Sequence, residues 1–329
     1  MTTVTVPDPI VDRIRSGQRF LITSHLNPDG DAVGTAVGTA RLLRRIGKVT
    51  QVWLHDAPPT LYLPMVGSER IHVGADVPTG FPEAYDAVIV LECPTLDRCG
   101  LESAVGQLPM INIDHHLGNE HYGTVNWVDS AAPAVGEMML RIAHSMKLEL
   151  DEATATALYL ALETDTGGFR FANATARAFE AAAALADAGA RPEKVAQWLY
   201  DSRPLSTLRL LGSALQNLEL TEGGQVAVVS VTAEMYRACE ATQRDTEGLI
   251  DHPRSIEGVE AVALIRELDE GGFKVSLRSR GELSVESVAR RHGGGGHRNA
   301  AGFKIEAADV EAAREQVLGE LAELVEAGR

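Results

Sequence analysis

Several features that mark other classes of protein are missing from this sequence. Its three cysteines, Cys93, Cys99 and Cys239, form neither a CxxC pair nor a framework of disulfides. No apolar run is long enough to span a bilayer, and the N-terminus lacks the basic and then apolar order of a signal peptide. We therefore expect a protein of the reducing cytoplasm that has no membrane partner.

Positive charge is also scarce. The chain has 30 lysines and arginines against 46 aspartates and glutamates, which gives a formal net charge of −16. Such an excess argues against binding to long duplex DNA or to an anionic membrane, because both carry the same sign of charge. A small basic site inside an acidic protein is still compatible with this total, so local charge is more informative.

The length and the apolar content indicate a globular chain of two domains. The 329 residues, of which 45% are hydrophobic, exceed what one core usually serves. In the first half, short strand-like runs alternate with helix-like runs, with strands expected at 19–24, 49–54, 86–92 and 109–113 and a helix at 32–46. This alternation predicts an α/β fold whose N-terminal sheet is mostly parallel and flanked by helices.

The pattern changes twice further along the chain. Residues 133–218 read as consecutive helices, and strands return at 226–231, 261–268 and 273–279, with helices at 284–292 and 310–327. The domain boundary is expected near residues 191–204. We predict an N-terminal domain over 1–195, a helical connector over 196–215 and a smaller C-terminal α/β domain over 216–329.

Candidate metal ligands begin at the end of the first predicted strand. His25, Asp29 and Asp31 fall within seven residues, on a loop that Pro28 and Gly30 bend. A mixed set of nitrogen and oxygen ligands favours Mn²⁺, Fe²⁺, Co²⁺ or Zn²⁺ over Mg²⁺ or Ca²⁺. The alternative is that the two aspartates are only turn residues that cap a helix beginning at Ala32.

Similar side chains follow other predicted elements. Glu92 ends one strand, the run Asp114, His115 and His116 ends another, and Asp165 follows a helix. In an open parallel sheet, ligands bind outside the carboxyl ends of the strands, so these pieces should converge in space. The sequence therefore predicts one shared site rather than unrelated loop residues.

A basic segment stands out near the C-terminus. Between residues 273 and 298 only two residues are acidic, whereas six are basic: Lys274, Arg278, Arg280, Arg290, Arg291 and Arg298. The four glycines Gly293, Gly294, Gly295 and Gly296 can expose backbone N–H groups to an anion, and His297 adds a side-chain donor. Arg278 is a further candidate for binding phosphate. The alternative is a flexible hairpin whose cations are scattered over a solvated face.

Taken in order along the chain, HLNPDGDAVG, IDHH, TDTG and GGGGHRNAAGF resemble the DHH phosphoesterases. Within that family they resemble the bacterial nanoRNases that also dephosphorylate 3′-phosphoadenosine 5′-phosphate. The resemblance implies a DHH domain with two divalent metal ions, most often Mn²⁺, a helical connector and a DHH-associated domain that grips the substrate across a cleft. It implies His25 and Asp29 as ligands of one metal, and Asp31, His115 and Asp165 as ligands of the other.

The resemblance also assigns roles around the phosphate, with one departure. It implies that His116 faces the substrate phosphate, and Asp114 is expected to orient a neighbouring histidine rather than to bind metal. The family usually has aspartate, which bridges both metals, where this chain has Glu92. Glutamate can also bridge, but its extra methylene displaces the carboxylate by about a bond length, and ligand distances tolerate only ~0.2 Å.

Three classes of function remain open at this point. The leading hypothesis is a two-metal hydrolase that cuts short oligoribonucleotides to nucleoside monophosphates and 3′-phosphoadenosine 5′-phosphate to AMP. The first alternative is a DHH enzyme that cleaves pyrophosphate or polyphosphate. The second is a nucleotide-binding regulator whose metal site is weakened at Glu92. The expected partner is a short RNA or a small phosphorylated nucleotide, and a homodimer is compatible with the sequence.

Overall fold

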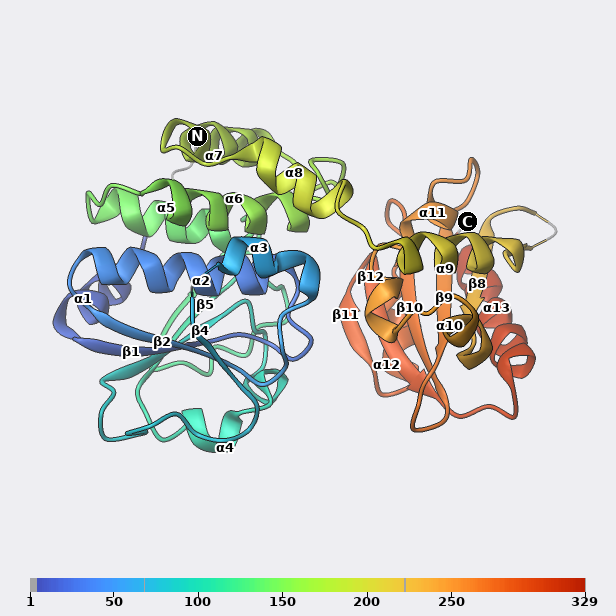
Figure 1. Ribbon diagram of the computed structural model, residues 1–329, viewed down its shortest axis with the longest axis horizontal. Helices are drawn as coiled ribbons and strands as arrows, with labels where there is room; N and C mark the ends of the chain where they lie inside the picture. Colours follow the sequence, from blue (N-terminus) through green and yellow to red (C-terminus); the bar gives the residue numbers. More distant parts are fainter. Residues whose placement is uncertain (1–4, 68, 222, 329) are drawn as a thin grey trace. The chain divides into compact units, whose positions relative to one another are not determined.

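Two compact units, Met1–Ser202 and Arg203–Arg329, make up the computed structural model, which describes residues 5–67, 69–221 and 223–328 apart from the side chain of His297 (Figure 1). The division into residues 1–195, 196–215 and 216–329 stays a prediction. The helix Pro192–Tyr200 (α8) belongs to the first unit and the helix Leu205–Gln216 (α9) to the second. Within the described residues, no helix is both long enough and apolar enough to cross a membrane.

The first unit is built on a six-stranded sheet with the order β3-β2-β1-β4-β5-β6, and every pair in it is parallel. This arrangement confirms the predicted α/β class. The edge strands β3 and β6 were not expected from the sequence, because they are short and only partly buried and so show no apolar run. The strands are β1 Arg19–Thr23, β2 Val49–Leu54, β3 Ile71–Val73, β4 Ala87–Leu91, β5 Met110–Asp114 and β6 Val125–Val128.

Helices form successive layers over this sheet. In Figure 1, α2 lies against the sheet, α5 and α6 lie on the far side of α2, and α7 and α8 lie outside them. The α-helices of this unit are α1 Asp8–Ser16, α2 Gly30–Arg45, α3 Leu63–Val66, α4 Glu102–Val105, α5 Val135–Ser145, α6 Glu152–Asp165, α7 Ala176–Asp187 and α8. Short 3₁₀ helices run over Thr60–Tyr62 and Leu96–Cys99.

Close packing between α2 and α6 depends on glycine. A Cβ atom added at Gly34 would lie 2.6 Å from the carbonyl oxygen of Ala157, and one added at Gly30 would lie 2.4 Å from the side chain of Thr164. Both distances are shorter than real Cβ contacts, so only glycine permits this approach. The contact brings the beginning of α2 against the end of α6, where two of the predicted metal ligands lie.

The second unit contains a smaller mixed sheet with the order β11-β12-β10-β9-β8-β7, in which only β8 and β9 pair in parallel. Its strands are β7 Glu219–Leu220, β8 Val226–Val231, β9 Ala261–Glu267, β10 Phe273–Ser279, β11 Gly295–His297 and β12 Ala300–Ile305. Its helices are α9, α10 Ala233–Ala238, η3 Gln243–Thr246, α11 Asp251–Arg254, α12 Glu286–Arg291 and α13 Val310–Ala327.

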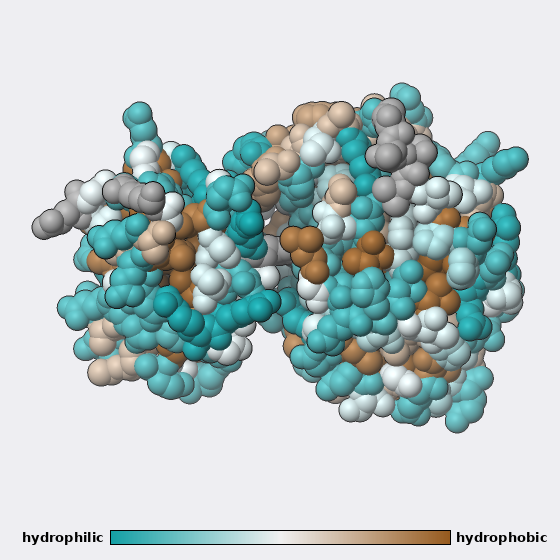
Figure 2. All heavy atoms as spheres, turned by 180° about the vertical axis from the view of Figure 1, so that it is seen from behind, coloured by the Kyte–Doolittle hydropathy of each residue, from teal (hydrophilic) through white to brown (hydrophobic). Residues whose placement is uncertain are grey.

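The two faces of this second sheet differ along β10. Phe273, Val275 and Leu277 are buried in a core shared with α12 and α13, whereas Lys274 and Arg278 alternate with them and are half-exposed. Because side chains alternate between the faces of a strand, the basic residues of β10 lie on the face opposite that core. Figure 2 shows a mainly hydrophilic surface on each unit, with apolar residues in small separate groups.

Candidate metal centre

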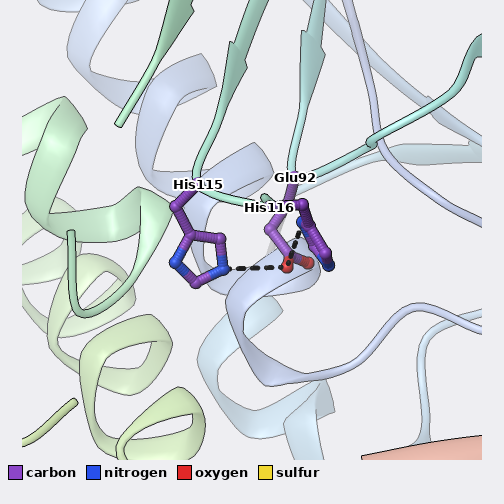
Figure 3. A group of neighbouring side chains, drawn as sticks. All are labelled: Glu92, His115 and His116. Atoms are coloured by element: carbon purple, nitrogen blue, oxygen red, sulfur yellow. Dashed lines mark ion pairs between the residues drawn. The ribbon is translucent and has the colours of Figure 1, made fainter. Parts of the chain in front are cut away.

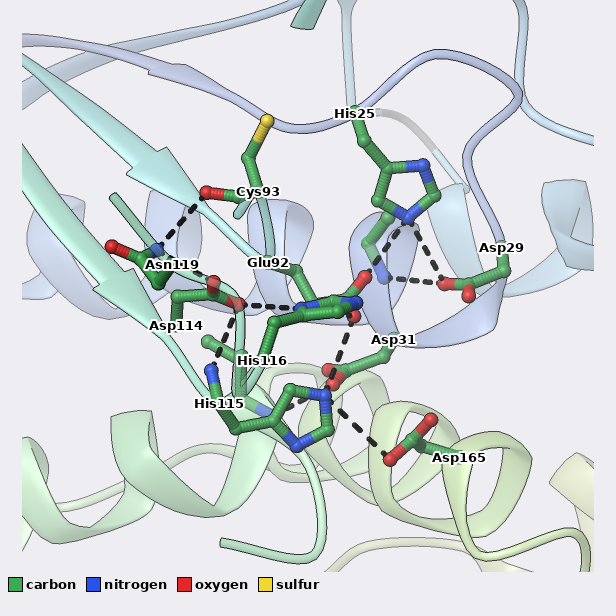
Figure 4. A network of polar contacts seen from close by, with 12 residues as sticks. His25, Asp29, Asp31, Glu92, Cys93, Asp114, His115, His116, Asn119 and Asp165 are labelled. Carbon is green, nitrogen blue, oxygen red and sulfur yellow. Dashed lines mark hydrogen bonds and ion pairs between the residues drawn. The ribbon is translucent and has the colours of Figure 1, made fainter. Parts of the chain in front are cut away.

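All the predicted metal ligands converge at the carboxyl end of the first sheet (Figure 4). They come from the loop after β1, the first turn of α2, the residue after β4, the residues after β5 and the last turn of α6. These are the ends that a parallel sheet brings to one edge. The residues brought together are His25, Asp29, Asp31, Glu92, His115, His116 and Asp165.

Two groups of potential ligands share this space. His25, Asp29 and Glu92 form one, and Asp31, His115 and Asp165 form the other; within each, one ligand atom per residue lies within 4.8 Å of the others. The resemblance to the DHH phosphoesterases implies the same two sets, with His25 and Asp29 in one and Asp31, His115 and Asp165 in the other. A third group, Glu92 with His115 and His116, connects the two by the same criterion.

Glu92 lies between the two groups. Its Oε2 atom is 2.9 Å from Nε2 of His25, and its Oε1 atom is 3.4 Å from Nε2 of His115. Figure 3 shows the same carboxylate between His115 and His116. Oε2 therefore faces His25 and Oε1 faces His115 and His116, so the carboxylate lies between the two ligand groups. The longer glutamate side chain fits where the family usually has aspartate.

The backbone at Glu92 is unusual. Its φ of 53° lies in the left-handed region, which costs a non-glycine residue on the order of 1–3 kcal/mol. The strand hydrogen bonds continue into this residue, because its N–H donates to the carbonyl of Ile113 at 3.0 Å. Such local strain is typical of functional sites, where the surrounding structure holds it in place.

Capping and metal binding are not exclusive for the two aspartates of the first loop. The carboxylate of Asp29 accepts a hydrogen bond from the N–H of Ala32 at 3.0 Å and caps α2, which begins at Gly30 and not at Ala32. Asp31 accepts from Thr35 Oγ1 at 2.6 Å and from two backbone N–H groups at the beginning of α5. Asp29 is thus a helix cap, but its side chain also belongs to the first ligand group, so capping is not its only candidate role.

Asp114 lies behind the histidines and not among the ligand groups. Its Oδ1 atom lies 2.8 Å from Nδ1 of His116 and accepts from the backbone N–H of His115, and its Oδ2 atom accepts from Asn119 at 2.6 Å. Burial would raise the pKa of Asp114, but the hydrogen bonds from His116 and Asn119 outweigh it and lower that pKa. An ionised Asp114 favours a proton on Nδ1 of His116, which leaves Nε2 of that ring for another partner.

The pKa values of the buried carboxylates and histidines indicate an excess of negative charge in the site, which divalent cations would neutralise. Burial and the nearby Glu92 raise the pKa of Asp31 well above its ordinary value, and burial raises the pKa of Asp165 to about 7. Burial alone would lower the pKa of His25 and His115, but the surrounding carboxylates raise both. Asp31 and Asp165 thus retain protons that divalent metal would displace. Two imidazoles with four carboxylates are also a chemically suitable donor set for such ions.

Sequence reasoning missed the residues that support the ligands. Asn173 donates to Oδ2 of Asp165 at 3.2 Å and to the carbonyls of Asp165 and Pro133 at 3.1 and 3.0 Å. Asn119 and Thr35 contact Asp114 and Asp31 in a similar way. No motif marks Asn173, because an isolated asparagine in a loop is ordinary. Asn119 lies three residues after the paired histidines, which is the one signal that could have drawn attention to it.

In the second unit, most of the predicted basic residues already have partners. Arg290, Arg291 and Arg298 pair with Glu286, Glu320 and Glu282. Arg278 has no acidic partner within the described part of the chain, and its guanidinium donates a hydrogen bond to the carbonyl of Leu277 at 3.0 Å. Arg278 is therefore the cation of this segment most available to a phosphate.

The four glycines make a tight hairpin. Gly295 and Gly296 lie in β11, which pairs with β12, and a Cβ atom at Gly294 or Gly296 would lie 2.2 or 2.4 Å from a carbonyl oxygen of β12. Close packing thus requires glycine at both positions, whatever they bind. A Cβ at Gly295 would meet open space, and Gly293 has a φ of 71°. The phosphate-binding role of the glycines stays a prediction, as does that of His297, whose side chain lies outside the described part.

Comparisons with known proteins agree with this geometry. Residues 19–162 match the N-terminal domain of the DHH family, and residues 223–323 match the DHHA1 domain. A bifunctional oligoribonuclease and PAP phosphatase NrnA of Thermus thermophilus is 33% identical over 301 residues, which cover 90% of this chain and 87% of that protein. The protein of the same description from Bacillus subtilis is 26% identical over 87% of this chain and 89% of its own length.

A solved structure also shares the fold. An exopolyphosphatase-related protein from Bacteroides fragilis is 26% identical, with a TM-score of 0.89, and the similarity covers 99% of this chain and 100% of that one. The similarity supports both the parallel sheet of the first unit and the smaller mixed sheet of the second.

The raised pKa of Asp165 predicts how stability depends on pH without metal. The folded chain holds a proton with a pKa of about 7, whereas an unfolded aspartate releases it near 3.9. The protonated Asp165 therefore contributes to the free energy of unfolding at low pH, and this contribution is lost as the pH rises through about 7. After chelation, Asp165→Asn should melt close to the unmodified protein only at about pH 4 or below, near the unfolded pKa, and clearly above it at about pH 8. Equal melting temperatures at both pH values would contradict the assignment.

Proposed function

The chain belongs to the DHH family of phosphoesterases, and we propose that it hydrolyses short oligoribonucleotides to nucleoside monophosphates and 3′-phosphoadenosine 5′-phosphate to AMP. The proposal rests chiefly on one observation, the two groups of histidine and carboxylate ligands that share Glu92. The Thermus and Bacillus relatives, described as oligoribonucleases and PAP phosphatases, indicate the class of substrate.

We further propose that the metal dependence of the family is met here by two Mn²⁺ ions. His25, Asp29 and Glu92 would hold one, and Glu92, Asp31, His115 and Asp165 the other. When bound, such a pair supplies an activated water and stabilises the charge that develops in a displacement at phosphorus. The ionised Asp114 keeps Nδ1 of His116 protonated, so that Nε2 can exchange a proton or hydrogen bond with a phosphate or leaving oxygen.

Selection of small substrates follows from the distribution of charge. The protein as a whole is strongly acidic, with a net charge of −16, and would repel a long polyanion over most of its surface. The half-exposed Arg278 on β10 and the glycine hairpin beside it offer a short anion-binding subsite in the second unit. Guanidinium groups bind phosphate in a bidentate manner, so Arg278 is assigned to substrate binding.

The state of the cysteines is compatible with a location in the reducing cytoplasm, which we also propose. Cys93, Cys99 and Cys239 are all free and buried, and burial raises the pKa of Cys93 and Cys99, the latter to about 11. Thiols in this state are protonated and unreactive, as in proteins of a reducing compartment.

Pyrophosphate or polyphosphate cleavage is the nearest alternative, because the Bacteroides structure is described as exopolyphosphatase-related. A panel assay separates the two activities. With Mn²⁺ present, a diribonucleotide and 3′-phosphoadenosine 5′-phosphate should be hydrolysed faster than pyrophosphate or tripolyphosphate, and Mg²⁺ should support lower rates. A diribonucleotide should also be cut faster than a long single strand. Preference for pyrophosphate, or full turnover after exhaustive chelation, would overturn the proposal.

The assignment of Arg278 predicts a specific loss of affinity. Arg278→Ala should raise KM for a diribonucleotide by about tenfold or more, the effect of one lost charge-assisted contact, without loss of bound metal. Arg290→Ala serves as a matched control, since Arg290 is 74% exposed on α12 and paired with Glu286. His297→Ala should behave like Arg278→Ala. Equal KM values for Arg278→Ala and Arg290→Ala would remove Arg278 from the substrate site.

The departure at Glu92 can be tested with two substitutions. Glu92→Gln keeps the shape but removes the charge shared by two cations, so it should lose the second metal and nearly all hydrolysis. Glu92→Asp should keep both metals and activity within about tenfold, equivalent to ~1.4 kcal/mol in the barrier. Elemental analysis beside the diribonucleotide assay reads out both. An inert unmodified protein whose Glu92→Asp variant turns over would identify a nucleotide-binding regulator instead.

A further inference from the structure

Asn119 connects the two loops that carry the central residues of the site (Figure 4). Its Nδ2 atom donates to Oδ2 of Asp114 at 2.6 Å and to the carbonyl of Cys93 at 3.3 Å. Cys93 follows Glu92 directly, and Asp114 is in turn 2.8 Å from Nδ1 of His116. One carboxamide thus contacts both the peptide after the shared carboxylate and the carboxylate behind His116.

The orientation of this carboxamide follows from its partners. Oδ1 accepts from the backbone N–H of His121 at 2.8 Å and from Nδ2 of Asn112 at 2.8 Å. A backbone N–H can only donate, and the ionised Asp114 can only accept, so the amide cannot be reversed. Both ends of the group are engaged, and the side chain is therefore held in one conformation.

The contact to Cys93 bears on the strained backbone of Glu92. The carbonyl of Cys93 also accepts a hydrogen bond from the hydroxyl of Tyr122 at 2.8 Å. Two donors from the loop after β5 therefore fix the residue that follows the left-handed Glu92. A strained conformation persists only where surrounding contacts determine it, and these two contacts are such a determinant.

We propose that Asn119 is a positioning residue of the phosphoesterase site, which holds Asp114 against His116 and fixes the backbone next to Glu92. This inference rests on the proposed function and adds a residue to it. Among the described residues, the hydrogen bonds of Asn119 reach no ligand atom of the two metal groups. Its effect on the reaction is transmitted through Asp114, whose carboxylate it shares with His116.

The sharpest test replaces the amide by its isostere. Asn119→Asp keeps the shape but turns the donor toward Asp114 into a second acceptor, so the two carboxylates repel each other. Asn126→Asp is the matched control, because Asn126 belongs to the same amide network through Asn112 but contacts Gly123 and not Asp114. The same chemical change is thus made two hydrogen bonds further from Asp114.

We expect Asn119→Asp to lower kcat for a diribonucleotide by about 100-fold, the scale of a misplaced acid–base group, while KM changes by less than about threefold. Asn126→Asp should keep kcat within about threefold of the unmodified protein. Asn119→Ala is a second variant, which removes the donor without adding charge and should also lower kcat. Melting temperature and metal content are measured for each variant. Parallel loss of kcat in the two aspartate variants would overturn the proposal and leave a structural network only.

A spectroscopic readout separates this inference from the proposed function. In Mg²⁺-loaded protein, the imidazole N–H of His116 that bonds to Asp114 should give a downfield proton resonance, assigned by its loss in His116→Gln. The resonance should persist in Asn126→Asp and shift or disappear in Asn119→Asp. If it is unchanged in Asn119→Asp, Asn119 does not position Asp114, whether or not diribonucleotide is cleaved. If diribonucleotide is not cleaved but the resonance responds, the function fails and the positioning role stands.

Discussion

Mutual repulsion between carboxylates is the constraint on which this site depends. Asp29, Asp31, Glu92 and Asp165 converge after β1 and β4, at the beginning of α2 and at the end of α6, where the imidazoles of His25 and His115 offset part of their charge. Without cations, burial and the neighbouring carboxylates raise the pKa of Asp31 and Asp165, so that these two side chains retain protons. Divalent ions would neutralise this repulsion and would then be available for phosphate chemistry, so the proposed function follows from the same electrostatics.

The fold makes that convergence possible through close helix packing. Gly30 and Gly34 let α2 approach α6 more closely than any larger residue would allow, so that Asp31 at one helix beginning lies beside Asp165 at another helix end. Asp31 also binds the first N–H groups of α5, which contribute a partial positive charge to it. The metal ligands are therefore held by backbone geometry as well as by side-chain contacts.

The central strands and the candidate metal ligands could be predicted from the sequence. The edge strands, the supporting asparagines and the role of the glycines could not, for physical reasons. The strands ending at Thr23, Leu91 and Asp114 are strongly apolar, so their carboxyl ends located the site. Short edge strands such as β3 and β6 lack that signal. The supporting contacts of Asn119 and Asn173 were not predicted, because an asparagine in a loop does not indicate by itself which residue it contacts in three dimensions. The glycines of 293–296 indicated that another group comes close to their backbone. Composition alone does not distinguish a phosphate from the neighbouring strand β12 as that group.

The central claim is that Glu92 bridges two metal ions. It is tested most directly by crystals grown with Mn²⁺ and measured at the manganese absorption edge. The account predicts two anomalous peaks, one beside His25 and Asp29 and one beside Asp31, His115 and Asp165, with an oxygen of Glu92 within about 2.0–2.2 Å of each ion, the distance usual for metal and carboxylate. A single peak, or two peaks with Glu92 turned away from either ion, would contradict it.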